Sequence, residues 1–132
     1  FVTTAYRNVG FSGDYGGSWL LNALVGPGTT KELYFTGRRV QANEALSLGI
    51  FNTVVPDNEL TTTVAALAKH IANGPAVALG YMKENINRAS QSGLRECLAL
   101  EADRLVRCAS TPDHREAVSA FIEKRPPVFN KP

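Results

Sequence analysis

The chain has 132 residues, of which 44% are hydrophobic and 20% charged, as in a soluble globular domain or part of one. Its 14 Lys and Arg against 12 Asp and Glu give a net charge of +2, too small to indicate a nucleic-acid partner. With only two cysteines and no apolar run of about 20 residues, the sequence excludes a disulfide scaffold and a membrane span, and we expect a cytoplasmic protein.

The N-terminal region combines strand-forming residues with a glycine-rich loop. Residues 1–9 are rich in Phe, Val, Thr and Tyr, which predicts a short buried strand. Residues 10–18 contain four glycines and predict sharp turns or a close approach of the backbone to another group. A helix is expected to begin near Ser18 and to be interrupted by Gly-Pro-Gly at residues 26–28, before a second helix that ends at Phe35.

The rest of the chain reads as mostly helical. An extended link, a short helix and a second strand are predicted over residues 38–41, 42–48 and 51–55. Helices are predicted over residues 58–72, 76–90 and 92–109, and a last helix runs to residue 124 with Thr111 as its cap and Pro112 at its first position. Cys97 and Cys108 would lie about 16 Å apart along one helix, so we expect both thiols to be free.

The glycine-rich loop presents one carboxylate, Asp14. The loop lacks the glycine spacing of dinucleotide sites and the Gly-Lys-Ser/Thr of a phosphate loop. Aromatic neighbours such as Tyr15 and Trp19 would desolvate Asp14, raise its pKa and suit it to proton transfer. Spacing alone favours another interpretation, in which Asp14 caps the following helix. A phosphate site at the helix N-terminus near Gly16 is a weaker alternative.

The remaining polar clusters predict no second site. His70 and His114 are far apart in sequence and lack partners at metal-ligand spacing, so we expect no metal. The basic pairs at residues 38–39 and 124–125, the latter with Lys131, are expected on a solvated face, although either could hold a phosphate at a pocket mouth.

Four segments carry a family resemblance. VGFSGDYGGSWLL at residues 9–21, ELYFTGRRV at 32–40 and ANEALSLGI at 42–50 resemble the enoyl-CoA hydratase/isomerase (crotonase) family. AFIEKRPPVF at residues 120–129 resembles the closing helix of that family. The resemblance covers nearly the whole chain in the right order, and in the family this region is the C-terminal half of a subunit.

The resemblance implies an α/β fold. This chain would be the C-terminal portion of the crotonase ββα superhelix, mostly helical with about two short strands, followed by a helical trimerisation region. We expect residues 1–56 to complete the core with the active-site loop, and residues 57–132 to serve in oligomerisation and CoA binding.

The implied function is hydration or isomerisation of enoyl-CoA thioesters through an oxyanion-stabilised enolate. Coenzyme A would be part of the substrate, with no separate cofactor, and the assembly would be a homo-oligomer, either a trimer or a dimer of trimers. In the family the two backbone N–H groups that stabilise the oxyanion come from segments that would precede Phe1, so we expect the chain by itself to be inactive. The alternative is a non-catalytic helical module for assembly or CoA binding.

The resemblance also implies roles for single residues. The glutamate of typical hydratases would fall at Tyr6, whereas Asp14 matches a proton-moving aspartate of dienoyl-CoA and ring-epoxide isomerases, which makes Asp14 the expected acid/base. The acyl pocket is expected to involve Tyr6, Gly13, Tyr15 and Trp19, although a core position for Trp19 is equally expected. Phe121 and Lys124 correspond to residues that reach the CoA of a neighbouring subunit.

Overall fold

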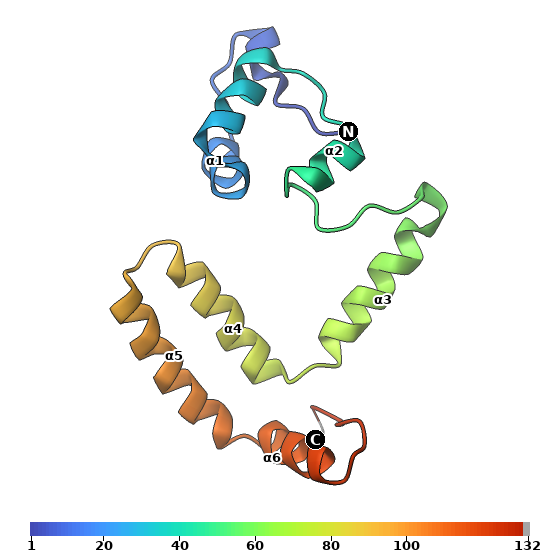
Figure 1. Ribbon diagram of the computed structural model, residues 1–132, viewed down its shortest axis with the longest axis vertical. Helices are drawn as coiled ribbons and strands as arrows, with labels where there is room; N and C mark the ends of the chain where they lie inside the picture. The colour runs from blue at the N-terminus through green and yellow to red at the C-terminus, as the bar shows by residue number, and fades with distance from the viewer. Residues whose placement is uncertain (131–132) are drawn as a thin grey trace. The chain divides into compact units, whose positions relative to one another are not determined.

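The computed structural model describes residues 1–130 (Figure 1). The chain divides into two compact units, Phe1–Leu60 and Thr61–Pro132, and each is described by itself. Helices dominate both units. The described residues pair as β-structure at one isolated antiparallel bridge, between Val2 and Val40.

The first unit is built around one long, broken helix. Its elements are the 3-10 helix η1 (Ala5–Val9), α1 (Gly17–Thr36) and α2 (Ala42–Ser47), followed by the 3-10 turn η2 (Asp57–Glu59). Gly26 interrupts α1 with φ 75° and ψ 169°, values that lie outside the helical region. The predicted interruption at residues 26–28 is therefore confirmed.

The strand predicted over residues 1–9 is wrong. Val2 exchanges two backbone hydrogen bonds with Val40, of 2.9 and 2.8 Å, but the pairing extends no further and the chain turns into η1. The hydroxyl of Thr4 donates to the carbonyl of Leu33 at 2.8 Å. Strand-forming side chains stabilise a strand only beside other strands, and within residues 1–130 no second strand lies beside this segment.

The strand predicted over residues 51–55 is also absent. The N–H groups of Ile50 and Phe51 both donate to the carbonyl of Ala45, at 2.8 and 3.2 Å. They therefore finish the turn that ends α2 instead of pairing with a strand. Their apolar side chains pack on the core of the first unit, which explains the strand-like composition without a sheet.

The core of the first unit is small. It consists of Leu33, Val40 and Ala45, with partly buried Leu21, Leu48, Ile50 and Phe51 packed against it. On the surface, Arg38 forms ion pairs with Glu32 at 2.6 Å and with Glu44 at 2.8 Å, so it connects α1 to α2. The hydrogen bond from Arg38 also lowers the pKa of Glu32. Two partly exposed carboxylates thus engage Arg38 on the surface of the first unit.

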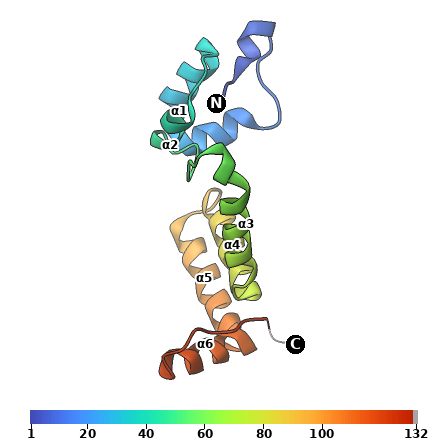
Figure 2. The same cartoon turned by 90° about the vertical axis from the view of Figure 1, so that its right-hand side faces the viewer.

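The second unit is helical throughout the residues that the structure describes. Its helices are α3 (Leu60–Ala72), α4 (Ala76–Ala89), α5 (Leu94–Ala109) and α6 (Pro112–Ile122). In Figures 1 and 2, α4 and α5 lie side by side as a helical hairpin. Ion pairs from Arg104 to Glu84 and from Arg88 to Glu96 join the two helices. Both cysteines lie on α5 and are free, as expected.

The C-terminal segment is held to the second unit by polar contacts. The Thr111 hydroxyl accepts a hydrogen bond from the N–H of His114 at 3.2 Å, so the predicted cap of α6 is confirmed. Asn130 then reaches back to the turn before α4, where its amide donates to the Gly74 carbonyl at 2.8 Å and accepts from the Ala76 N–H at 3.3 Å.

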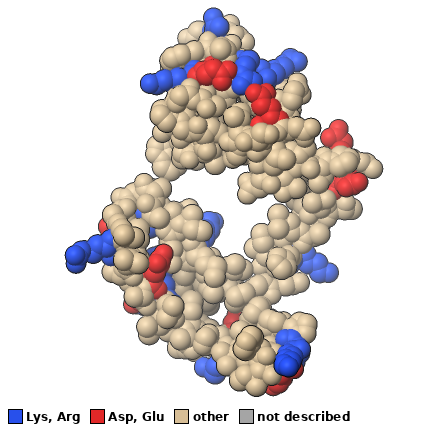
Figure 3. Space-filling model, viewed as in Figure 1, with Lys and Arg blue, Asp and Glu red and all other residues tan. Residues whose placement is uncertain are grey.

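Large apolar side chains lie exposed along the helices of the second unit. On α3 they form a stripe at helical spacing, 52 to 59% exposed, made of Leu60, Val64, Leu67 and Ile71. Charged groups of both signs are interspersed in Figure 3, and most of the visible face is uncharged. None of the helices described in residues 1–130 is both long enough and apolar enough to span a bilayer.

Candidate functional site

The loop that carries Asp14 lies between η1 and α1. Left-handed glycines mark both ends of the loop, Gly10 with φ 72° and Gly16 with φ 72°. The N–H of Phe11 donates to the Tyr6 carbonyl at 3.0 Å, and the N–H of Gly17 donates to the Asp14 carbonyl at 3.0 Å. These bonds and turns fold the loop back so that Asp14 comes beside η1.

The carboxylate of Asp14 is held by a tyrosine and caps no helix. The Tyr6 hydroxyl donates to Asp14 Oδ1 at 2.5 Å. The cap residue of α1 is Gly16, and no side chain accepts a hydrogen bond there. The helix-capping interpretation of Asp14 is therefore wrong: the loop turns the carboxylate toward Tyr6, and Asp14 contributes only its backbone carbonyl to the start of the helix.

A second tyrosine, which the sequence analysis missed, supports the first. Tyr34 on α1 stacks on Tyr6 with ring centroids 5.9 Å apart and planes inclined by 25°. Its ring edge lies so close to the loop that a Cβ on Gly13 would be 3.1 Å from Tyr34 Cε1, and one on Gly17 would be 2.8 Å from the Tyr34 hydroxyl. The glycines at these two positions therefore make room for Tyr34, a close approach of the kind that the glycine-rich composition predicted.

The pKa of Tyr6 is raised above its ordinary value. The main cause is the hydrogen bond that Tyr6 donates to Asp14, and partial desolvation and the nearby negative charge act in the same direction. Because the folded-state pKa is above the unfolded one, the stability from this contact is present at neutral pH and is lost as the pH rises through the raised value. Tyr6 is thus a protonated donor to Asp14 under ordinary conditions.

Tyr15 and Trp19, two further residues expected in the acyl pocket, are both exposed. Tyr15 follows Asp14 directly but has φ 50° and a side chain that is 95% exposed. Trp19 is 56% exposed and so is not part of the core. It lines a hollow of about 330 Å³ that also includes Pro27 and Lys31. The contacts of the first unit thus join Tyr6 and Asp14 directly and bring Gly13 against Tyr34.

The two expected CoA-binding residues lie at the end of α6. Phe121 is 85% exposed, and Lys124 has φ 54°, the left-handed conformation common just after a helix. The neighbouring Arg125 is partly exposed, in agreement with the expected solvated face, and it pairs with Glu116 at 2.5 Å and with Glu123 at 2.5 Å. Lys124 is therefore the exposed cation of this basic pair, and Lys131 lies outside the described residues.

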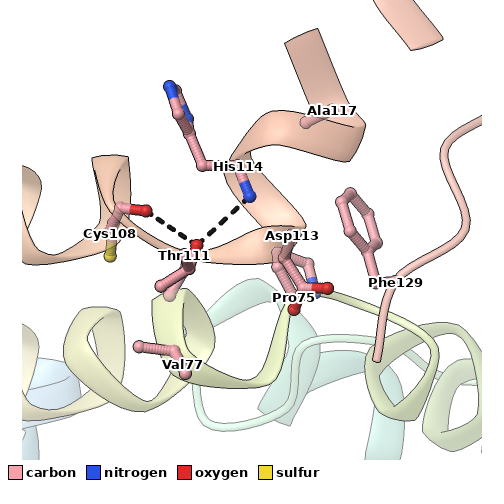
Figure 4. Close-up of a pocket in the computed structure, with 9 residues that line it drawn as sticks. Pro75, Val77, Cys108, Thr111, Asp113, His114, Ala117 and Phe129 are labelled. Carbon is pink, nitrogen blue, oxygen red and sulfur yellow. Dashed lines mark hydrogen bonds between the residues drawn. The ribbon is translucent and has the colours of Figure 1, made fainter. Parts of the chain in front are cut away.

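A small pocket in the second unit brings Cys108 and His114 near each other without forming a catalytic pair. The pocket has a volume of about 130 Å³ and is largely apolar (Figure 4). The thiol and the imidazole point in different directions, and the Thr111 hydroxyl donates to the Cys108 carbonyl at 2.7 Å. No group of three or more His, Cys, Asp or Glu in residues 1–130 is placed to hold a metal ion.

Comparisons with known proteins identify the family. Residues 2–132 match the family model described as enoyl-CoA hydratase/isomerase. The chain belongs to the enoyl-CoA hydratase/isomerase family. It is 39% identical over 117 residues to a short-chain-enoyl-CoA hydratase of Clostridium acetobutylicum, which covers 89% of this chain and 45% of the relative. It is 37% identical over 125 residues to a 1,2-epoxyphenylacetyl-CoA isomerase of Escherichia coli, covering 95% of this chain and 48% of that enzyme.

Solved structures of the enoyl-CoA hydratase/isomerase family share the fold. An enoyl-CoA hydratase from Polaromonas sp. JS666 matches with a TM-score of 0.91 and 32% identity, over 97% of this chain and 50% of that one. The chain spans about half the length of these relatives. The expected crotonase fold is confirmed, and the chain corresponds to its mostly helical C-terminal portion.

Proposed function

We propose that the protein that carries this chain acts on enoyl-CoA thioesters through an enolate, with Asp14 as the acid/base. The observation behind this proposal is the presentation of Asp14, an exposed carboxylate held by the Tyr6 hydroxyl at 2.5 Å between left-handed glycines. Relatives that are a hydratase and an epoxyphenylacetyl-CoA isomerase support the substrate class. Coenzyme A enters as part of the substrate, and a cytoplasmic location belongs to the same proposal.

The proposed reaction is a shift of one proton along the acyl chain. Asp14 removes a proton from the carbon next to the thioester, and the C–H electron pair enters a dienolate whose oxygen carries the negative charge. Protonated Asp14 returns the proton to the far end of the dienolate, so that the double bond moves and the formula is unchanged. The oxyanion needs two backbone donors, which the family supplies ahead of the region that corresponds to Phe1, and we propose that the chain alone is inactive for that reason.

Mass spectrometry in heavy water tests the proposed reaction. The purified protein is incubated with a 2-enoyl-CoA and, separately, with a 3-enoyl-CoA. Isomerisation moves the double bond, which chromatography against the two authentic thioesters detects, and adds no water; the product carries deuterium only to the extent that protonated Asp14 exchanges with the solvent before it returns its proton. A moved double bond supports the proposed proton shift, whereas addition of one D₂O without a moved double bond would overturn that shift in favour of hydration. Substrates that return with the double bond unmoved and no added water would favour the alternative, a helical module that binds CoA or assembles without chemistry.

Substitutions of Lys124 test the proposed CoA contact. Lys124→Ala removes the charge and keeps a side chain in the left-handed conformation, whereas Lys124→Gly removes the charge and also relieves the backbone strain. We expect both variants to bind CoA roughly tenfold more weakly in calorimetry, since a hydrogen bond to a charged group is worth about 1.5 kcal/mol or more. Only Lys124→Gly should raise the free energy of unfolding, by about 1 kcal/mol. Unchanged CoA affinity in both variants would remove Lys124 from the site.

We also propose a homo-oligomer, a trimer or a dimer of trimers. The apolar stripe of α3 supports this proposal, because an exposed apolar patch on a folded protein marks a contact with another protein surface. We expect Leu67→Lys, within the stripe, to lower the assembly state in sedimentation while the helical circular dichroism is kept. Ala66→Lys, on another side of α3, should leave the assembly unchanged. If the two variants and the parent protein form assemblies of equal mass in sedimentation, the stripe is not an interface.

A further inference from the structure

The carboxylate of Asp14 sits on a loop that does little by itself to orient it. Asp14 follows Gly13, whose φ is 119°, and precedes Tyr15 and Gly16, whose φ values are 50° and 72°. The residue is exposed, and glycines on either side leave the backbone more freedom than other residues would. A base that transfers a proton must be held in one orientation, since a displacement of about 1 Å can cost about two orders of magnitude in rate.

The Tyr6 side chain supplies the missing restraint. Its hydroxyl donates to Oδ1 of Asp14 at 2.5 Å, a charge-assisted contact of the stronger kind. The hydrogen bond from Tyr6 engages Oδ1, and within residues 1–130 Oδ2 has no hydrogen bond, so Oδ2 can exchange a proton with a substrate. Since a phenol that lost its proton could no longer donate, the raised pKa of Tyr6 extends the pH range of the contact further into the alkaline region.

Tyr6 is itself held by the fold. Its backbone lies in η1, and its carbonyl accepts the N–H of Phe11 at 3.0 Å, which closes the turn toward the loop. Its ring stacks on Tyr34, which in turn fits against Gly13 and Gly17. The restraint on Asp14 therefore runs from the body of α1 through two stacked rings to one carboxylate oxygen.

We propose that Tyr6 is a positioning residue that holds Oδ1 of Asp14 so that Oδ2 carries out the proton transfer. This inference rests on the proposed function. It differs from the expected place of Tyr6 in the acyl pocket, because a side chain that only lines the pocket would alter substrate binding. Loss of a positioning hydroxyl instead lowers kcat and leaves KM nearly unchanged.

Kinetics of Tyr6→Phe separate these roles. In the purified protein that carries these residues, we expect kcat for an enoyl-CoA to fall about tenfold and KM to change by less than about threefold, because the ring and its stacking on Tyr34 are kept. The double variant Tyr6→Phe with Asp14→Asn should be no slower than Asp14→Asn alone, since the two residues act as one unit. Tyr81→Phe, on α4 and outside the site, is the matched control and should keep the parent kinetics.

An ultraviolet titration of the tyrosines tests the pair without any assay of activity. The chain has four tyrosines, so the difference between the parent and Tyr6→Phe isolates the ionisation of Tyr6. We expect Tyr6 to ionise at a higher pH than a free tyrosine, and the ionisation to move to lower pH in Asp14→Asn because the negative charge is gone. The charged or titratable groups that face Tyr6 are Asp14 and Tyr34. If Tyr6→Phe fails to fold, the total tyrosine titrations of the parent and of Asp14→Asn are compared directly, because the shift between them does not require that variant.

The outcomes distinguish the inference from the function on which it rests. If Tyr6→Phe keeps the parent kcat while Asp14→Asn loses it, the positioning role is wrong and the proposed function stands. If Asp14→Asn keeps the parent kcat, both are wrong. If Tyr6 ionises at the same pH in the parent and in Asp14→Asn, the hydrogen-bonded pair is absent in solution and the proposed positioning role of Tyr6 is wrong.

Discussion

Replacing Asp14 with asparagine is expected to lower kcat for an enoyl-CoA substrate by about 10²- to 10⁴-fold, the usual contribution of a positioned acid/base. Asparagine keeps the size of the side chain and an oxygen that can accept a hydrogen bond from the Tyr6 hydroxyl. It cannot take up or return a proton at neutral pH. The fold of the loop should therefore survive while the chemistry is lost. Initial rates with a saturating substrate measure the effect.

The matched control for this experiment is Asp57→Asn. Asp57 also belongs to the first unit but lies in η2, away from the loop, and we expect its replacement to leave kcat within about twofold, as is usual for a surface site. CoA binding should be unchanged in both variants. Loss of activity in both would indicate a general loss of structure, and full activity in Asp14→Asn would require another acid/base.

Replacing Leu33 with alanine is expected to reduce the free energy of unfolding of the first unit by about 2–5 kcal/mol. Leu33 is 3% exposed and belongs to a core with few buried members, so few neighbours are available to fill the space that its side chain leaves. The same segment of α1 carries Tyr34, so this core also supports the ring that stacks on Tyr6. Denaturant unfolding of the parent and variant, followed by circular dichroism, measures the change.

Leu24→Ala provides the comparison for Leu33→Ala. Leu24 also lies on α1 but is 55% exposed, so its truncation removes less buried surface and should cost about 1 kcal/mol or less. A similar loss for both variants would mean that the core is not centred on Leu33. The result matters for the site, because a loosened α1 would also loosen the support of Tyr6 and Asp14.

The helices were predictable from the sequence because their signals are local. Gly-Pro-Gly at residues 26–28 interrupts α1 because Gly26 adopts a φ of 75° and a ψ of 169°, which lie outside the right-handed helical region. Thr111 and Pro112 begin α6 for a similar reason: a hydroxyl that accepts the His114 N–H and a proline at the first position act within one turn.

The strands were not predictable because a strand depends on its partner. Residues 1–9 and 51–55 have the composition of strands, but Val2 pairs with Val40 at one point only. The N–H groups of Ile50 and Phe51 donate hydrogen bonds to the carbonyl of Ala45 instead of to a neighbouring strand. The core of the first unit takes up Ile50 and Phe51 without a sheet, whereas Phe1 and Val9 in the first segment stay more than half exposed.

The family and the proposed acid/base came from the sequence alone, because both rest on short motifs whose residues are neighbours in the chain. Asp14 is recognisable among its glycines, and the family model confirms the resemblance. What only the tertiary structure decided is how Asp14 is held. The turn at Gly10 returns the loop to Tyr6, and the packing of α1 against η1 places Tyr34 on the Tyr6 ring. Tyr6 and Asp14 are eight positions apart and Tyr34 lies on another helix, so these contacts depend on how the loop and α1 fold and not on a periodic pattern of neighbouring residues.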